Sequence, residues 1–224
     1  MTGRFITFEG GEGAGKSTQI KRLAHSLEAA GKTVLLTREP GGSPGAEEIR
    51  TLVVTGAPDR WDAVTEALLI FAARRDHVER VIKSALARGE WVLCDRFTDS
   101  TAAYQGAAHG LGREWVRRLA GEVLGDFEPD LTLVLDLPVE TGVARATARG
   151  GADRFERMGP AFHGALRQAF LDIAAEEPDR CAVIDADGSV ERVADAVRAV
   201  VAQRLPESGL AAAHPDRRDA SDGG

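Results

Sequence analysis

The sequence predicts an α/β fold in which a parallel sheet of about five strands is covered by helices on both faces. Short runs that are apolar almost throughout recur along the chain, as expected for strands that are buried on both faces. Longer segments with helical spacing lie between these runs. Such alternation is typical of a doubly wound sheet with right-handed crossovers, whose ligands bind at the carboxyl ends of the strands.

The individual elements follow from this pattern. Strands are expected at Phe5–Phe8, Thr33–Thr37, Trp91–Asp95, Leu131–Leu137 and Cys181–Asp185. Helices are expected at Lys16–Ala30, Ala46–Thr55, Asp62–Arg88, Arg113–Leu124, Pro138–Arg149, Pro160–Glu177 and Val190–Leu205. Gly31 and Gly89 each directly follow a helix, where a C-terminal stop belongs, and Pro138 suits a first helical turn.

The composition indicates one folded domain followed by a tail. Hydrophobic residues make up 43% of the 224 residues, which is enough to build a core. We expect residues 1–205 to form this domain. From residue 206 to residue 224 the chain is poor in apolar residues and cannot bury enough surface to offset its ordering entropy, so we expect a disordered tail there.

Charge and cysteine content narrow the class of protein. The formal net charge of −7 argues against a non-specific nucleic-acid binder, because phosphate contacts along a nucleic acid require a basic surface. Cys94 and Cys181 both lie in strand-like runs, and we expect them to be buried free thiols in a reducing compartment. The sequence contains no apolar run that approaches a membrane span and no evident signal peptide, so we expect a cytoplasmic protein.

The segment between the first strand and the first helix matches the pattern G-x-x-x-x-G-K-[ST]. Its residues are Gly10, Gly11, Glu12, Gly13, Ala14, Gly15, Lys16 and Ser17, followed by Thr18. Backbone N–H groups of such a loop turn inward around a β-phosphate, Lys16 reaches the β- and γ-oxygens, and Ser17 offers its hydroxyl to Mg²⁺. The sequence therefore predicts a P-loop NTPase fold that binds a nucleoside triphosphate such as ATP together with Mg²⁺.

A P-loop alone does not define the reaction, because ATPases, GTPases, transporters and nucleotide kinases share it. The chain has no Asn-Lys-x-Asp segment for guanine recognition and no Leu-Ser-Gly-Gly-Gln signature of transporter ATPases. Both absences favour a reaction in which a second ligand receives the phosphate.

Charged residues at the ends of two further strands suit such an acceptor. Arg38 ends the second strand and could hold an acceptor phosphate. Asp95 ends the third strand, where a carboxylate can hold Mg²⁺, orient a water or take a proton, and Arg96 beside it could clamp the anion between donor and acceptor. Phe71 and Arg74 share one face of a helix, where an aromatic ring could stack on a base and an arginine could meet a phosphate or a carbonyl.

Together these segments carry a resemblance to a known family. The order Phe-Glu-Gly-x-Glu-Gly-Ala-Gly-Lys-Ser-Thr-Gln, then Thr-Arg-Glu-Pro-Gly-Gly, then Cys-Asp-Arg-Phe-x-x-Ser-x-x-Ala-Tyr-Gln-Gly resembles bacterial thymidylate kinases from Arg4 to about Leu205. The resemblance implies Mg²⁺-dependent transfer of phosphate from ATP to dTMP, giving dTDP for dTTP biosynthesis. It also implies a homodimer that packs through helices such as Ala46–Thr55 and Asp62–Arg88.

The resemblance assigns the acceptor residues as well. It implies that Glu12 lies near the sugar 3′-hydroxyl of dTMP. The arginines expected around the acceptor phosphate are Arg38, Arg74 and Arg96. The residues expected to line the thymine and deoxyribose pocket are Ser100, Tyr104 and Gln105. In one departure, Ile70 stands where the family usually has a phenylalanine beneath the base. Either Phe71 takes over as the stacking platform or the base packs on aliphatic surface.

The segment at about residues 149–158 is expected to form a short lid. Phosphoryl transfer requires positive charge against the reacting oxygens, and positions 11–14 of the loop contain no arginine. A helix leads into a Gly-Gly hinge at Gly150-Gly151, as a closing lid requires. Arg149 and Arg154 are our candidates for contact with the γ-phosphate, with Arg145 nearer the adenine. By resemblance, the chain belongs to the class that places its catalytic arginine in the lid.

Two other functions remain open from the sequence. One is the same chemistry on another nucleoside monophosphate, such as dUMP, because the departure at Ile70 concerns the base. The other is a P-loop switch protein that only binds or slowly hydrolyses ATP. The hypothesis of a switch protein gives no function to Arg38, Arg74 and Arg96.

Overall fold

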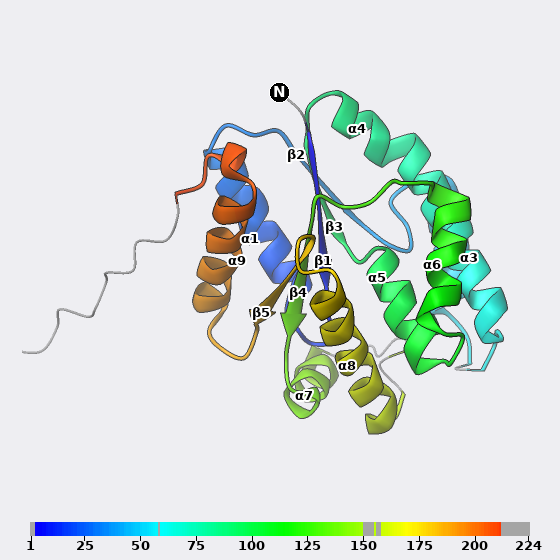
Figure 1. Ribbon diagram of the computed structural model, residues 1–224. Helices are drawn as coiled ribbons and strands as arrows, with labels where there is room; N and C mark the ends of the chain where they lie inside the picture. The colour runs from blue at the N-terminus through cyan, green and yellow to red at the C-terminus, as the bar shows by residue number, and fades with distance from the viewer. Residues whose placement is uncertain (1–2, 58, 150–154, 156–157, 212–224) are drawn as a thin grey trace, which may run out of the picture.

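The computed structural model describes residues 3–57, 59–149, 155 and 158–211 of the chain. Its centre is a sheet of five parallel strands in the order β2-β3-β1-β4-β5 (Figure 1). The strands are β1 (Arg4–Glu9), β2 (Val34–Arg38), β3 (Trp91–Asp95), β4 (Leu131–Asp136) and β5 (Cys181–Asp185). The predicted parallel α/β sheet of about five strands is confirmed.

Helical segments alternate with these strands. They are α1 (Lys16–Ala29), α2 (Pro44–Val54), α3 (Ala63–His77), η1 (Val78–Ile82), α4 (Lys83–Ala87), α5 (Thr98–Thr101), η2 (Ala102–Ala108), α6 (Arg113–Leu124), α7 (Val139–Arg149), α8 (Pro160–Glu176), α9 (Val190–Arg204) and η3 (Pro206–Ser208). Three of those described begin at side-chain caps that the sequence supplies. Ser43 accepts a hydrogen bond from the Ala46 backbone at α2, Asp62 accepts from Val64 and Thr65 at α3, and Ser189 accepts from Arg192 at α9.

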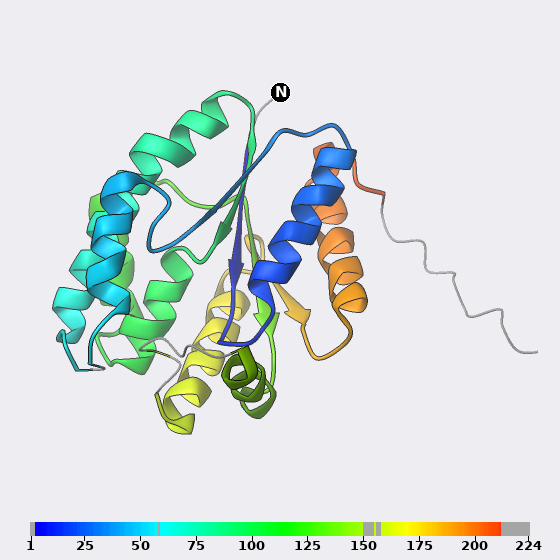
Figure 2. The ribbon, with the colours of Figure 1, turned by 180° about the vertical axis from the view of Figure 1, so that it is seen from behind.

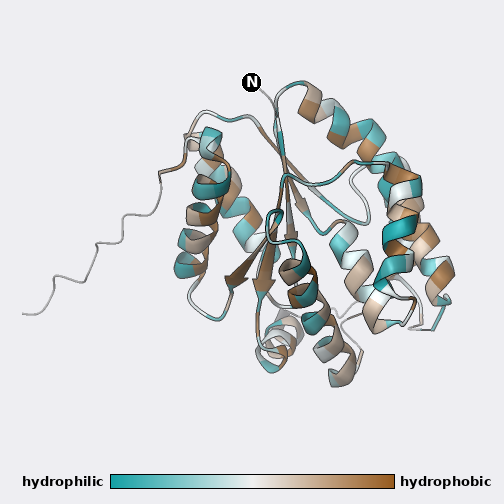
Figure 3. Cartoon of the chain, in the orientation of Figure 1, coloured by the Kyte–Doolittle hydropathy of each residue, from teal (hydrophilic) through white to brown (hydrophobic). Residues whose placement is uncertain are grey.

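The sheet is buried on both faces. Helices α1 and α9 lie side by side on one face (Figures 1 and 2), where residues such as Leu27 and Val197 pack against Ile6. The other face carries α3, α6 and α8, and Phe5, the neighbour of Ile6 in β1, packs there. Figure 3 shows the strands as hydrophobic along most of their length. Because neighbouring residues of one strand face opposite layers, near-continuous apolar runs are what this sheet requires.

Two helical regions differ from the expectation. The predicted helix Asp62–Arg88 consists of α3, α4 and a π-helical segment η1 between them. The segment Thr98–Ala108, for which no helix was predicted, forms α5 and the π-helical η2. Its buried residues include Asp99, Ser100 and Gln105. A helix that buries polar side chains lacks the apolar periodicity by which helices are recognised in a sequence.

The folded chain continues past the predicted boundary at residue 205. Ser208 is fully buried in η3, and Leu210 packs against the α1–α9 core. Glu207 forms an ion pair with Arg4. The disordered tail predicted for 206–224 is therefore wrong for 206–211, because these residues bury surface after all; residues 212–224 lie outside the described part.

The predicted free thiols are confirmed, since Cys94 and Cys181 are both buried and unpaired. Among the described residues, no helix is long and apolar enough to cross a membrane.

Candidate active site

The predicted phosphate loop lies between β1 and α1, at the carboxyl edge of the sheet (Figure 1). Its backbone passes very close to neighbouring chain. A Cβ atom on Gly10 would lie 2.4 Å from the Leu135 carbonyl oxygen, and one on Gly13 would lie 2.1 Å from the Gly142 oxygen. Both glycines also have positive φ angles, of 131° and 72°. Glycine is therefore required at these two positions on steric and on conformational grounds.

Lys16 is buried inside this loop. Its Nζ donates hydrogen bonds to the carbonyl oxygens of Gly10 and Gly11, at 2.9 and 2.8 Å. Burial lowers the pKa of Lys16 from its ordinary value, and the nearby Arg96 lowers it further. Ser17, at the start of α1, donates to Asp95 Oδ2 at 3.2 Å. The structure thus brings together the hydroxyl and the carboxylate that the sequence assigned to Mg²⁺.

A cavity of about 150 Å³ opens beside the loop. The predicted acceptor residues that line it are Glu12, Arg38, Arg74, Asp95, Arg96, Ser100, Tyr104 and Gln105. They come from the phosphate loop, from the ends of β2 and β3, from α3 and from α5–η2. The phosphate loop therefore has a separate pocket beside it, as transfer between two ligands requires.

Glu12 links the loop to this cavity. Its Oε1 accepts hydrogen bonds from Arg96 Nη2 and from the Tyr104 hydroxyl, both at 2.6 Å. Burial alone would raise the pKa of Glu12, but Arg96, Lys16 and the Tyr104 hydroxyl lower it to about 2. Glu12 is therefore a fixed carboxylate at neutral pH.

Arg96 has an unusual backbone conformation, with a φ angle of 71° in the left-handed region. Its Nη1 donates to the Gly10 carbonyl and to Ser100 Oγ, both at 3.2 Å, and its guanidinium carbon lies 4.9 Å from the Tyr104 ring centre. Burial would lower the pKa of Arg96, but Tyr104 and Glu12 raise it above its ordinary value. A strained residue that is held on every side is typical of a functional site.

Glu9 was not selected from the sequence, but it holds two residues that line the cavity, Phe97 and Ser100. It is completely buried, and its two oxygens accept from the Phe97 backbone N–H at 2.7 Å and from Ser100 Oγ at 2.5 Å. Burial and the charge of Asp99 raise the pKa of Glu9 to about 7. A carboxylate at the end of an otherwise apolar strand was the available signal.

Arg38 and Arg74 both reach the cavity but differ in burial. The Arg38 side chain is 53% exposed, and its Nη2 donates to both carboxylate oxygens of Glu47 at 3.0 Å. Arg74 is 2% exposed, and its Nε donates to Glu39 Oε2 at 2.6 Å. Glu39 and its second partner, His77, were also missed, because Glu39 entered the sequence analysis only as part of the Thr-Arg-Glu-Pro-Gly-Gly segment and His77 not at all.

The proposed substrate contact of Phe71 is wrong. Phe71 is 1% exposed and packs in the core with Val78 and Phe97, whereas its neighbour Ile70 lines the cavity. Consecutive helix residues point about 100° apart, so Ile70 can face the cavity while Phe71 faces the core. Of the two apolar neighbours that the sequence left open, the structure thus places Ile70, and not Phe71, in the cavity wall.

The structure describes only part of the segment at about 149–158 that was predicted to form a lid. Arg154 and the side chain of Arg149 lie outside the described residues. Arg145, on α7, donates to the Ala186 carbonyl at 3.4 Å and is 43% exposed. Phe155 lines the cavity and meets the Tyr104 ring edge-on, with 5.3 Å between ring centres. An aromatic residue of the predicted lid segment thus packs on the cavity wall.

The fold and the site together define a P-loop nucleotide kinase, in which a triphosphate loop adjoins a pocket for an acceptor. The family model for thymidylate kinase matches residues 8–197. A thymidylate kinase of Caulobacter vibrioides is 63% identical over 203 residues, which cover 91% of this chain and 98% of the relative. A thymidylate kinase of Rhodopseudomonas palustris is 54% identical over 95% of this chain and 94% of the relative. One of Magnetococcus marinus is 56% identical over 87% of this chain and 93% of the relative. The chain belongs to the thymidylate kinase family.

The raised pKa of Glu9 predicts a pH-dependent stability. Its pKa is about 7 in the fold and ordinarily 4.5, so the folded chain holds this proton more tightly than the unfolded chain. The stability contributed by this group is complete below pH 4.5 and is lost as the pH rises to 7. Relative to Glu9→Gln, we expect the wild-type free energy of unfolding to fall by on the order of 3 kcal/mol across this range.

Urea unfolding of both proteins at a series of pH values measures this difference. Glu12→Gln is the matched control, because the lowered pKa of Glu12 leaves that carboxylate ionised throughout the same range. A Glu9→Gln difference that stays constant with pH would show that Glu9 ionises normally.

Proposed function

We propose that this chain transfers the γ-phosphoryl group of ATP to dTMP and releases ADP and dTDP, a step in dTTP biosynthesis. The position of Glu12 carries the proposal. This residue belongs to the phosphate loop by sequence, yet its carboxylate is bound to Arg96 and Tyr104 in the wall of the acceptor cavity. One short loop thus reaches both ligands, and the family relatives carry the name thymidylate kinase.

The donor phosphates are assigned to the loop. Its backbone N–H groups and Lys16 bind the β- and γ-oxygens, where Lys16 exchanges its bonds to the Gly10 and Gly11 carbonyls for phosphate oxygens. Ser17 and Asp95 lie 3.2 Å apart and offer the oxygen ligands that Mg²⁺ prefers, so they would hold it. When bound, Mg²⁺ supplies charge against the β- and γ-phosphate oxygens.

The acceptor phosphate is assigned to the arginines at the strand ends. Arg96 is held between donor loop and acceptor wall, and Arg38 lies at the rim, where a phosphate would compete with Glu47 for its guanidinium. A phosphate oxygen is already a competent nucleophile, so no strong base is needed. The rate then depends on positioning and on electrostatic stabilisation of the reacting oxygens.

The remaining positive charge is assigned to the lid. Positions 11–14 contain no arginine, so Arg149 and Arg154 are proposed to contact the γ-phosphate on closure. Arg145 is proposed to lie nearer the adenine, in keeping with its contact to Ala186 after β5. With these roles, the chain is proposed to belong to the class with the catalytic arginine in the lid.

The base and the sugar are assigned to the far part of the cavity. Ile70, Val53 and Val54 give it an aliphatic surface, and Gln105 is held there by a 2.6 Å hydrogen bond to Glu66. Tyr104 lies where an aromatic ring would exclude a ribose 2′-hydroxyl by size. A kinase for dUMP remains the nearest alternative, because an aliphatic wall distinguishes thymine from uracil only through one methyl group.

Assembly and location complete the proposal. Helices α2 and α3 pack together and expose Leu52, Val64 and Leu68, which are 40%, 42% and 50% exposed. We propose that this apolar surface forms a homodimer interface. We also propose that the enzyme acts in the cytoplasm.

The acceptor is identified by measuring ADP release from ATP with a panel of nucleoside monophosphates. We expect turnover with dTMP to exceed turnover with dUMP, and ribonucleotides to be poor acceptors because of Tyr104. A P-loop switch protein would give no stimulation by any monophosphate. Preference for another monophosphate would correct the acceptor and leave the kinase assignment intact.

Removal of the lid charge separates catalysis from acceptor binding. Arg154→Ala is expected to lower kcat by roughly 10³-fold with little change in the KM for dTMP, because it removes charge stabilisation of the transition state. Steady-state kinetics measure both values. Arg118→Ala is the control, since Arg118 is exposed on α6 and pairs only with Glu114 among the described residues. Undiminished turnover in Arg154→Ala would show that the charge comes from another residue.

A further inference from the structure

The Arg74 guanidinium is held by three hydrogen bonds, and none of them uses its Nη1 nitrogen. Its Nε donates to Glu39, and its Nη2 donates to the Phe97 carbonyl at 2.9 Å and to Thr101 Oγ1 at 3.0 Å. The rings of Phe71 and Phe97 lie 4.7 and 5.1 Å from its central carbon. Nη1 is buried and has no hydrogen-bond partner among the described residues, although Arg74 lines the acceptor cavity.

A buried charged donor without a partner destabilises a protein unless a ligand supplies the acceptor. The Nη1 group therefore suits an oxygen of the bound nucleotide, either a base carbonyl or a phosphate oxygen. Its direction is set by the partners of Nε and Nη2, because the guanidinium is planar and its donors have a fixed geometry.

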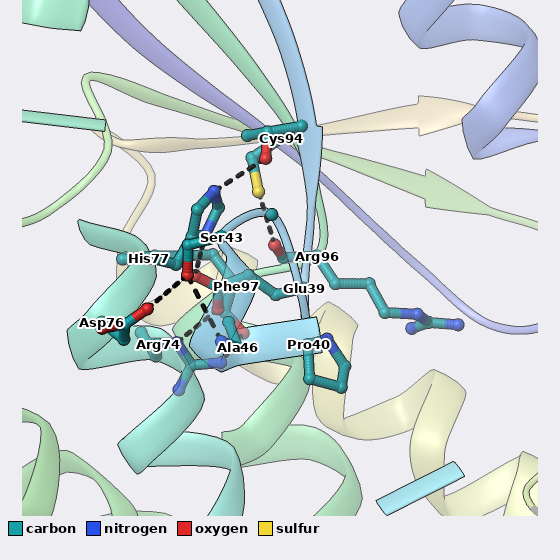
Figure 4. A network of polar contacts seen from close by, with 12 residues as sticks. Glu39, Pro40, Ser43, Ala46, Arg74, Asp76, His77, Cys94, Arg96 and Phe97 are labelled. Carbon is teal, nitrogen blue, oxygen red and sulfur yellow. Dashed lines mark hydrogen bonds and ion pairs between the residues drawn. The ribbon is translucent and has the colours of Figure 1, made fainter. Parts of the chain in front are cut away.

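Glu39 is the charged member of those partners. It is 4% exposed and holds Arg74 with Oε2, while its Oε1 lies 2.9 Å from His77 Nδ1. Arg74 and His77 are three residues apart on α3 and share one face of it. Figure 4 shows Glu39, Arg74 and His77 gathered in one group, with the Arg96 side chain extending away from it.

His77 is fixed in turn by the end of β2. Its Nε2 lies 2.7 Å from Thr37 Oγ1. A Cβ atom on Gly42 would lie 2.3 Å from that nitrogen and 2.6 Å from the threonine oxygen. Gly42 also has a φ angle of 88°, which favours glycine. The Thr-Arg-Glu-Pro-Gly-Gly segment thus supplies a threonine, a carboxylate and a close backbone turn around a single imidazole.

The carboxylate fixes the direction of one of these contacts. Glu39 accepts, so His77 donates to it through Nδ1–H, and the second hydrogen bond joins Nε2 and the Thr37 hydroxyl. Glu39 then carries one negative charge against the one positive charge of Arg74. His77 is fully buried and does not line the cavity, so it acts on a ligand only through Glu39 and Arg74.

We propose that His77 and Glu39 are positioning residues of the acceptor site, which hold Arg74 so that its Nη1 group meets an oxygen of the acceptor nucleotide. The proposal rests on the proposed function, because it assigns the cavity to the acceptor. It predicts that changes at His77 alter acceptor binding and leave ATP binding unchanged.

Two substitutions at His77 test the proposal, because each retains one half of the imidazole. The amide nitrogen of His77→Asn lies near the Nδ1 position and can still donate to Glu39. The amide of His77→Gln lies near the Nε2 position and loses Glu39. We expect His77→Gln to raise the KM for dTMP about tenfold, with the KM for ATP unchanged, and His77→Asn to stay within about threefold of wild type.

Asp76→Asn is the matched control, since Asp76 adjoins His77 on α3 but binds Ser43 and Arg80 instead. It is expected to leave both KM values unchanged. Thermal unfolding of each variant checks the fold. Equal KM values for dTMP in His77→Gln and wild type would overturn the proposal, as would a parallel rise in both KM values. Wild-type protein without dTMP-dependent turnover would instead contradict the proposed function.

Calorimetric binding of thymidine, which lacks the phosphate, identifies the oxygen that Nη1 meets. If His77→Gln weakens thymidine binding as much as dTMP binding, the contact is to the base. If it weakens dTMP binding alone, the contact is to the phosphate. If it weakens neither, the positioning role is contradicted.

Discussion

The Arg96 guanidinium joins the two halves of the site. It binds the Gly10 carbonyl in the donor loop, Ser100 in the helix that walls the acceptor cavity, and the Glu12 carboxylate between them. This reach depends on its left-handed backbone directly after β3, which lies next to β1 in the sheet. The order of the strands therefore places the end of β3 against the loop that follows β1, and the geometry of both ligand sites follows from that neighbourhood.

The electrostatics of the site are local, in a protein whose overall charge is negative. Charges enter the interior in compensated groups: Glu12 with Arg96, and Glu39 with Arg74. Such pairs offset the cost of removing each ion from water, but they contribute little net stability. These pairs instead hold side chains in place, because each pair presents a hydrogen-bond donor or acceptor to the cavity. Glu9 forms no such ion pair among the described residues, and its burial together with the charge of Asp99 raises its pKa.

Much of the fold could be predicted because its signals are local. Apolar strand runs and the loop Gly10–Ser17 are each explained by the residues they contain. The features that could not be predicted depend on where side chains point in the folded chain and on which elements meet there. Ile70 and Phe71 are both apolar, and only the rotation of α3 decides which one faces the cavity. The helix Thr98–Ala108 buries polar groups and so lacks a hydrophobic pattern. His77 is meaningful only beside Glu39, which comes from another element.

We propose that Glu12, a residue of the donor loop, also belongs to the acceptor site. Calorimetric titration of Glu12→Gln with dTMP and, separately, with a non-hydrolysable ATP analogue tests it directly. The substitution removes the carboxylate that is expected to accept from the sugar 3′-hydroxyl and that holds Arg96 and Tyr104 in the cavity wall, so dTMP should bind at least about tenfold more weakly while the ATP analogue binds as to wild type. Unchanged dTMP affinity, or an equal loss for both ligands, would contradict the claim.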